Sequence, residues 1–304
     1  MPLDTFGSAL LGRNGAVSRL LRLFISILFY AQSLLRRTFW RFVGRQAPPT
    51  CIVLYYHSVP SRYRAAFIRQ LEMLSRLTRP VNAADAITLL PGLRYAAVTF
   101  DDGFEDAIEN TVPELVKRNI PAVFFVTADF LGTLASWWPE STDERNRRIA
   151  SVAQLRAIPR KLIRIGAHTL THPHLSDLDE ADAKREIAES RRHLELLLGY
   201  GVETFSFPYG DFNSKLVSWC QQAGYKRVFT SQHTWAFQSP DELVVGRVKA
   251  EPTDWDLEFR LKLLGGYLWM PWASTVKQKI LARLRLAHLR FFGVLSSRRS
   301  TAAS

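Results

Sequence analysis

The chain has 304 residues, of which 47% are hydrophobic, 12% aromatic and 22% charged, and it carries a formal net charge of +12. This composition is typical of a globular protein and excludes a disordered, collagen-like or coiled-coil chain. The length allows one large domain or two ordinary ones. The two cysteines, Cys51 and Cys220, lie in apolar surroundings and cannot form a disulfide framework, so we expect two buried, reduced thiols.

The positive charge is concentrated at the two ends of the chain. Residues 1–49 contain seven arginines and one acidic residue, and residues 277–304 contain seven lysines and arginines and no acidic residue. Of the 40 basic and 28 acidic residues, 26 and 27 therefore remain in residues 50–276, whose net charge is −1. A nucleic-acid-binding domain carries its basic charge on the folded body, so we expect no nucleic-acid partner. We divide the chain into a basic N-terminal segment, a central domain and a basic C-terminal tail at these boundaries.

The N-terminal segment contains an uncharged run of 13 residues, Leu23 to Leu35, with arginines on both sides. The run is shorter than the ~18 to 20 apolar residues that a membrane-spanning helix needs. On a helix the polar and apolar side chains separate into two faces, which is typical of a helix that lies on a membrane. The polar face holds Arg19, Arg22, Ser26, Tyr30, Ser33, Arg37 and Arg41, and the apolar face holds Leu21, Phe24, Leu28, Leu35 and Phe39.

Two alternatives stay open for this segment. It resembles a secretory signal with a short apolar core, although Arg36 and Arg37 follow at once and no small-residue cleavage site is present. It could also be a helix that packs on its own domain.

The C-terminal tail repeats the amphipathic design. An apolar stripe that includes Ile280 and Leu284 lies opposite basic residues such as Lys279 and Arg283, and Trp269 and Trp272 precede the tail. Two basic amphipathic ends suit the anionic cytoplasmic leaflet of a membrane, so we expect peripheral binding through both termini.

The central domain alternates short apolar runs with helical patterns. The predicted strands are residues 51–56, 96–100, 122–126, 162–166, 204–207, 226–230 and 243–248, and the predicted helices are residues 65–78, 111–119, 179–199 and 214–224. Repeated strand-then-helix order predicts parallel strands with right-handed crossovers. Seven such units in residues 50–276 fit an α/β fold, either a distorted (β/α) barrel with about seven parallel strands or a doubly wound sheet, flanked by amphipathic terminal helices.

Polar residues follow the predicted strands at the points where the strands end. They are His57, Asp101, Asp102, His168, His172, Pro208, Tyr209, Ser231 and Arg247. The carboxyl ends of parallel strands meet at one face of such a fold, and that face carries active sites. We therefore expect these side chains to converge.

Two motifs at this face predict a metal site. In TFDDG (99–103), two adjacent carboxylates would repel each other unless a cation lies between them. In HTLTH (168–172), two histidines four residues apart would lie on one side of a helical turn and could share one ion. With a carboxylate they form three protein ligands and leave a position open for water, as in catalytic zinc sites.

These residues resemble the polysaccharide deacetylase family, also called the chitooligosaccharide deacetylase homology domain, over roughly residues 50–250. TFDDG matches a motif whose first Asp is the catalytic base and whose second binds the metal, which implies these roles for Asp101 and Asp102. HTLTH matches the motif whose histidines bind the metal, here His168 and His172. FSFPYG (205–210) matches the motif whose Tyr backbone N–H binds the oxyanion, here Tyr209. VLYYHSVP (53–60) is similar to the first strand of a bacterial branch that acts on exopolysaccharides.

The chain departs from the family at two places. Many members carry an Arg two residues before the Pro of the third motif, where this chain has Ser206, and Arg247 could replace that Arg. The late Leu-x-His motif that supplies a general acid has its letters only at residues 286–288, inside the basic tail. The acid is therefore unassigned. Its candidates are His57, His174 and Asp211, and the expected substrate contacts are His57, Pro208, Arg247 and Trp138.

The resemblance implies a hydrolase that removes N-acetyl groups from amino sugars of a polysaccharide or its lipid-linked precursor, with Asp101 as general base and a metal-activated water as nucleophile. One divalent ion is expected, in the first place zinc, although cobalt, nickel and iron also suit two histidines and a carboxylate. The alternatives are a deformylase or deacylase of a lipid-linked sugar, and an inactive glycan-binding protein. The resemblance to a bacterial branch implies a bacterial protein, and the two basic ends predict a peripheral position at the cytoplasmic face of the inner membrane. The alternative is a protein anchored by its signal in the periplasm.

Overall fold

The computed structural model describes residues 13–271, with side chains from Val17 onward. The chain divides into one compact unit that ends at Tyr267 and a second that begins at Leu268. The predicted C-terminal amphipathic segment and the Leu-x-His letters at residues 286–288 lie outside the described residues.

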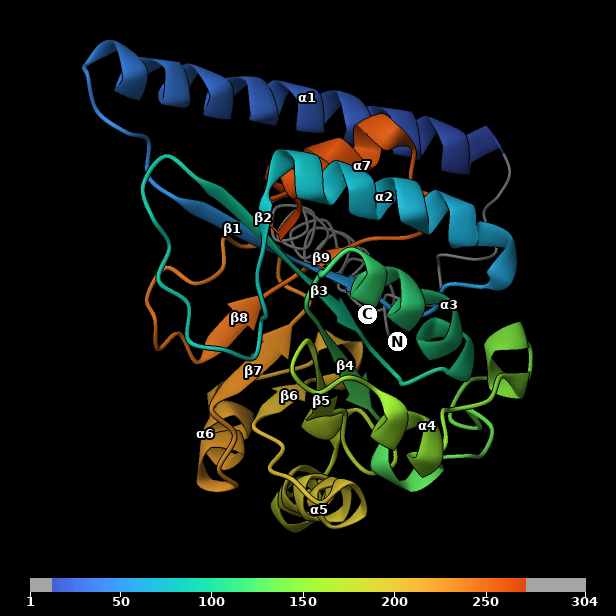
Figure 1. Ribbon diagram of the computed structural model, residues 1–304. Coiled ribbons are helices and arrows are strands. Elements are labelled where there is room, and N and C mark those ends of the chain that lie inside the picture. Colours follow the sequence, from blue (N-terminus) through green and yellow to red (C-terminus); the bar gives the residue numbers. More distant parts are fainter. Residues whose placement is uncertain (1–12, 272–304) are drawn as a thin grey trace, which may run out of the picture. The chain divides into compact units, whose positions relative to one another are not determined.

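The unit that ends at Tyr267 alternates strands and helices, as predicted (Figure 1). Its strands are β1 (Thr50–Tyr56), β2 (Arg79–Pro80), β3 (Arg94–Phe100), β4 (Ala122–Val126), β5 (Ile163–Ala167), β6 (Thr204–Ser206), β7 (Arg227–Thr230), β8 (Val244–Gly246) and β9 (Val248–Lys249). Its helices are α1 (Arg13–Phe42), α2 (Arg64–Leu77), α3 (Glu105–Lys117), α4 (Val152–Ala157), α5 (Glu180–Leu198), α6 (Ser214–Gln222) and α7 (Asp256–Leu263).

The sheet is parallel throughout and runs in the order β8-β7-β6-β5-β4-β3-β1-β9, with the short β2 beside β3. The two end strands, β8 and β9, are halves of one segment on either side of Arg247. The first half pairs with β7, where Thr230 lies opposite Gly246, and the second pairs with β1, where Leu54 lies opposite Val248. This segment closes the sheet on itself, so the predicted distorted (β/α) barrel is confirmed.

Large apolar side chains pack on both faces of β1, β3 and β4, which are buried as strands of parallel sheets are. Val123, Phe125 and Phe229 belong to one core cluster. On the other face of the sheet Phe100 and Phe124 stack with their ring centroids 4.4 Å apart, Tyr56 stacks on Phe100 at 5.5 Å, and Phe67 of α2 packs on both Tyr56 and Phe100. Cys51 and Cys220 are buried and free, and burial raises the pKa of both thiols. Both are therefore structural, as expected.

Helix α3 begins six residues earlier than the sequence predicts. The sequence pattern predicts a helix over residues 111–119. In the structure Pro113 lies inside α3, and Glu105 and Asp106 occupy the first turn, where their charges stabilise the N-terminus. The prediction of this boundary was wrong.

Helix α1 has 30 residues and is much longer than the uncharged run of 13. Its part Val17–Phe42 is the one helix in residues 13–271 that is long and apolar enough to cross a membrane, by length and composition only. It packs against α7, through Arg19 and Glu258 among others, so the alternative of a helix that contacts its own domain does apply.

Candidate metal and catalytic site

The two adjacent aspartates lie directly after β3, at the carboxyl end of the barrel. Asp101 continues the sheet, since its N–H donates to the carbonyl of Tyr56 at 2.8 Å. Asp102 has a left-handed backbone with φ 69° and is followed by Gly103 with φ 81°. A Cβ on Gly103 would lie 2.8 Å from Cγ1 of Val126, so only glycine fits this turn. The sharp turn lets neighbouring carboxylates point to different partners.

The two histidines lie in a loop after β5, not on a helical turn, and this part of the prediction was wrong. The backbone is left-handed at Thr169 (φ 65°) and His172 (φ 64°), which no α-helix allows. The Thr169 hydroxyl donates to the carbonyl of His168 at 2.5 Å and accepts from the N–H of His172 at 2.9 Å. Strained, non-glycine residues of this kind gather at functional sites.

Glu186 on α5 holds this loop in place, a role that the sequence analysis missed. Its buried carboxylate accepts hydrogen bonds from the backbone N–H groups of Leu170 (2.9 Å) and Thr171 (3.0 Å) and from the Thr171 hydroxyl (2.7 Å). The sequence does contain a signal, because Glu186 falls on the apolar face of α5 beside Ala183 and Ile187. A glutamate on a buried helix face needs partners of this kind.

Asp102, His168 and His172 form a buried cluster whose ligand atoms all lie within 4.8 Å of one another. Oδ1 of Asp102 is 3.5 Å from Nε2 of His168 and 3.2 Å from Nε2 of His172. Burial opposes ionisation of Asp102, but hydrogen bonding to His168 and His172 outweighs it and holds the pKa of this carboxyl well below its usual range. Burial lowers the pKa of His172. An ionised carboxylate beside a neutral imidazole is the state in which these groups bind a metal.

Several features show that these residues fit a divalent cation. Nδ1 of His168 donates to the carbonyl of Ser206 at 2.7 Å, so Nε2, which faces Asp102, is the ring nitrogen that could bind a metal. Among the described residues, Oδ2 of Asp102 and Nδ1 of His172 are buried polar atoms without a hydrogen-bond partner. The His172 ring packs against Trp137, with the centroids 5.0 Å apart, and against Tyr209 at 4.8 Å. Two imidazoles and one carboxylate are a catalytic donor set.

Arg247 lies behind Asp101 and is only 1% exposed. Its Nη1 and Nη2 donate to the two carboxylate oxygens of Asp101 at 2.7 and 2.8 Å. The remaining donors reach Oγ1 of Thr99 (3.1 Å), Oγ of Ser206 (2.8 Å) and the carbonyl of Thr230 (3.3 Å), so all five N–H groups have partners. Ser206 stands where the family resemblance led us to expect an Arg, and its hydroxyl accepts a hydrogen bond from this guanidinium. The position suits the orientation of Asp101 and not the glycan contact that was also expected of Arg247.

The electrostatics of Asp101 follow from this pairing. Burial alone would raise the pKa of its carboxyl. The charge and hydrogen bonds of Arg247 outweigh that effect and lower the pKa, so Asp101 is ionised. The two adjacent aspartates therefore have separate partners: a guanidinium for Asp101 and the two imidazoles for Asp102.

The other predicted site residues surround these groups. His57 follows β1, and its pKa is lowered by burial although the carboxylates of Asp102 and Asp101 act in the opposite direction. Nδ1 of His174 donates to Oδ2 of Asp211 at 2.5 Å, and the His174 ring stacks on Tyr209 with the centroids 3.7 Å apart. Pro208 is buried at the end of β6.

The expected Trp138 contact stays a prediction. Trp137, its neighbour, is the indole that packs on His172, and both indole N–H groups are buried without a partner among the described residues. Tyr209 has a left-handed backbone with φ 58°, like Asp102 and His172.

The barrel and its Asp-His-His cluster have the composition of a metal-dependent hydrolase, and the comparisons with known proteins agree with that class. Residues 91–228 match the family model described as polysaccharide deacetylase, so the chain carries a polysaccharide deacetylase domain over these residues. Its homologues and structural neighbours are polysaccharide and peptidoglycan deacetylases, which are hydrolases acting on amide bonds.

Two curated relatives and one solved structure are similar to the chain. The peptidoglycan-N-acetylglucosamine deacetylase of Bacillus cereus is 27% identical over 150 residues, which are 48% of this chain and 48% of that protein. The chitooligosaccharide deacetylase of Rhizobium leguminosarum bv. phaseoli is 25% identical over 151 residues, 48% of this chain and 59% of that protein. The structure of IcaB from Ammonifex degensii matches with a TM-score of 0.58 and 25% identity, and covers 71% of this chain and 98% of IcaB. The chain thus spans about half the length of these two curated relatives.

Proposed function

We propose that this protein removes N-acetyl groups from the amino sugars of a polysaccharide or of its lipid-linked precursor. The observation that carries the proposal is the division of labour between neighbouring carboxylates. Asp101 is held ionised by Arg247, while Asp102 joins His168 and His172 in the metal cluster. A base beside a metal is the arrangement that hydrolysis of an unactivated amide requires.

A divalent ion bound by Asp102, His168 and His172 would supply Lewis-acid chemistry, because it polarises an acyl carbonyl and makes water more acidic. Asp101 then takes the proton from the attacking water. Arg247 occupies two of the roughly four lone-pair positions of this carboxylate, so positions remain to accept that proton. We assign the backbone N–H of Tyr209, at the strained turn after β6, to the oxyanion.

The departing amine needs a proton, and two histidines flank the metal ligands. His57 is close enough to Asp101 and Asp102 for their charges to affect its pKa, and His174 is paired with Asp211. We propose His57 as the donor, because His174 already has a carboxylate partner and a stacked ring. Replacing His57 with Gln should then reduce turnover far more than the same change at His174.

The alternative of an inactive glycan-binding protein rested on two departures from the family, the Arg missing from position 206 and the unassigned acid. Arg247 delivers a guanidinium to Asp101, so the first of these departures no longer supports the alternative. The test is acetate release from N-acetylated peptidoglycan, chitooligosaccharide and exopolysaccharide fragments, with Asp101→Asn as the control that keeps the metal ligands. We expect release by the wild type only. Formate release from formylated lipid-linked sugars, without acetate release from any member of this set, would favour the deformylase instead.

A further inference from the structure

Helix α1 turns the side that carries Arg19, Ser26 and Arg37 toward the protein and its apolar face outward. Figure 1 shows α1 beside α7 along the outside of the domain. Ser26 is fully buried on the inner face, and Arg19 and Arg37 on the same face are half-buried. An amphipathic helix of a globular protein packs the other way, with its apolar stripe against the core. The inverted arrangement leaves the apolar stripe of α1 without a partner among the described residues.

Two arginines tie the ends of α1 to the barrel. Nε and Nη2 of Arg19 donate to Oε2 of Glu258 at 2.9 and 2.6 Å, and Nη2 also donates to the carbonyl of Thr253 at 2.9 Å. Nη2 of Arg37 donates to the carbonyl of Gly92 at 3.0 Å. Thr253 follows β9 and Gly92 precedes β3, so α1 runs along the barrel wall from the catalytic edge to the opposite edge. These contacts hold both ends of α1 against the barrel wall.

The outward stripe of α1 is long, apolar and uncharged. It consists of Val17, Leu21, Phe24, Leu28, Leu35, Phe39 and Phe42, which are 55 to 89% exposed, with the exposed Ala31 in its middle. The exposed Leu20, Ile27 and Leu34 widen it on one side. Contiguous apolar surface of this kind marks a binding site for a protein or a membrane.

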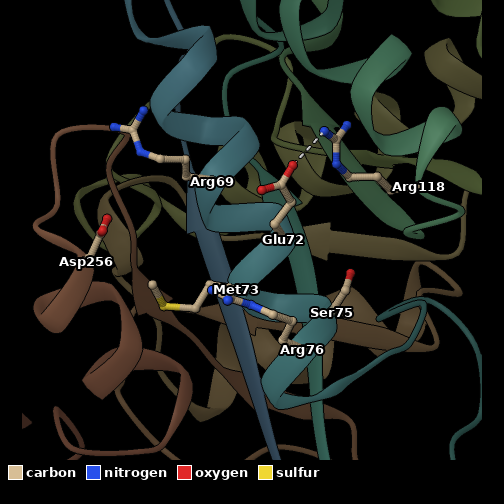
Figure 2. A pocket seen from close by; sticks show the side chains of 7 residues that line it. All are labelled: Arg69, Glu72, Met73, Ser75, Arg76, Arg118 and Asp256. Atoms are coloured by element: carbon tan, nitrogen blue, oxygen red, sulfur yellow. Dashed lines mark hydrogen bonds and ion pairs between the residues drawn. The ribbon is translucent and has the colours of Figure 1, made fainter.

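The charges around the stripe identify the partner. α1 contains six arginines and no acidic residue, and Arg22, Arg36 and Arg41 are exposed at its flanks. A second copy of the chain would bring arginines against arginines, without the opposite charges that helix pairs use. The groove of about 570 Å³ between α2 and α7 is more mixed in charge, since three arginines, Arg69, Arg76 and Arg118, line it together with Glu72 and Asp256 (Figure 2), and the charges that identify the partner are those of α1 itself. Apolar side chains bordered by arginines match the acyl chains and phosphates of an anionic bilayer.

We propose that α1 is an in-plane membrane anchor, whose stripe enters the surface of an anionic bilayer while the barrel stays in the water beside it. Interfacial helices enter the boundary between headgroups and acyl chains by about 5 to 10 Å, which suits a stripe of single side chains. A helix that crossed the bilayer would have to give up both arginine ties. The proposal does not rest on the deacetylase activity.

The first test is binding of the full chain to vesicles. We expect it to sediment with vesicles of phosphatidylglycerol and phosphatidylethanolamine and much less with phosphatidylcholine. The variant Leu21→Gln, Leu28→Gln, Leu35→Gln should lose at least about tenfold in partition coefficient, since each substitution removes an inserted apolar side chain. The matched control is Leu196→Gln, at an 81% exposed leucine on α5, and it should bind as the wild type does. Equal binding by the triple variant and the wild type would overturn the proposal.

A dimer of the wild type in analytical ultracentrifugation that the triple variant abolishes, together with no vesicle binding, would assign the stripe to a second copy instead. Acetate release from a soluble substrate serves as a separate readout. It should be the same in the triple variant and in the wild type, because the stripe touches no site residue. Loss of membrane binding and loss of activity are therefore distinguishable.

The second test distinguishes an in-plane helix from a spanning one. Single cysteines at positions 21, 28 and 35 can be labelled selectively with an environment-sensitive dye, because Cys51 and Cys220 are buried. Position 35 lies about 21 Å along the helix from position 21. Depth-dependent quenching by spin-labelled lipids should place all three dyes at one shallow depth. A steep change of depth along the series would show a spanning helix and contradict the proposal.

Discussion

Arg247→Lys tests whether the guanidinium positions and ionises Asp101. Lysine keeps the positive charge but offers three donors from one nitrogen, and cannot serve both oxygens of Asp101 together with Thr99 and Ser206. Removing one partner of a buried pair costs about 3 to 5 kcal/mol when nothing replaces it, and lysine should recover part of that. We expect kcat/KM to fall about 100-fold, the usual cost of a misplaced catalytic group.

The pH dependence of kcat/KM is the readout that separates this role from simple destabilisation. With Arg247 in place the pKa of Asp101 is lowered, so the carboxylate stays ionised well into the acid range. In Arg247→Met the strongest effect that opposes burial is lost and the pKa of Asp101 rises, so the acid limb of the profile should move to higher pH. Metal content measured on the same samples shows whether the ligands are intact.

The chain offers a matched control and a rescue. Arg227 on β7 is also buried, but it donates to backbone carbonyls, among them those of Ala83 and Asp85. Arg227→Lys should lower stability and leave the acid limb unmoved. Ser206→Arg added to Arg247→Ser returns the Arg to the position that many relatives use and should regain part of the lost rate. An Arg247→Lys enzyme with kcat/KM within about threefold of wild type and an unmoved acid limb would refute the reasoning.

Three further predictions concern the metal loop, the aspartate turn and pH. Glu186→Gln should weaken metal affinity about 10- to 100-fold in chelator competition, because the loop that carries the histidines loses a charged acceptor. The control Glu180→Gln, on the exposed face of α5, should leave the affinity unchanged. Equal affinities of Glu186→Gln and the wild type would contradict this role of Glu186. Gly103→Ala should lower the unfolding free energy by about 1 to 3 kcal/mol in chemical denaturation, since φ is 81° and the new Cβ meets Val126; an unchanged midpoint would count against it. Because burial lowers the pKa of His172, protons should compete with the metal for this imidazole only below about pH 6.5. A metal affinity, measured by calorimetry, that already falls between about pH 8 and pH 7 would contradict this prediction.

Much of the fold follows from local patterns. Runs such as AVFFV are fully buried strands, as a parallel sheet requires, and polar residues after them converge because parallel strands end at one face. The absence of an Arg at position 206 also pointed to Arg247 as its replacement. The sequence alone could not show that Arg247 reaches Asp101, because that contact depends on how the last strand segment pairs with the rest of the sheet.

Other features depend on contacts far apart in the sequence. The HTLTH spacing suggested a helical turn, but the backbone between the two histidines is left-handed at Thr169. Its N–H groups bind the carboxylate of Glu186, 14 residues after His172, and the spacing does not reveal this contact. The position of α1 is a second example. Its two faces are legible in the sequence, but which one meets the domain is decided by Arg19 and its partner Glu258, 239 residues away.

Acetate release with and without metal tests the central claim most directly. The full chain would be stripped with a chelator, reloaded with zinc, cobalt, nickel or iron(II), and incubated with N-acetylated glycan fragments beside Asp101→Asn. The account predicts release by the reloaded wild type, none by the stripped protein, and at most a trace by Asp101→Asn with its metal still bound. Release that persists in the stripped protein, or in Asp101→Asn at the wild-type rate, would contradict it.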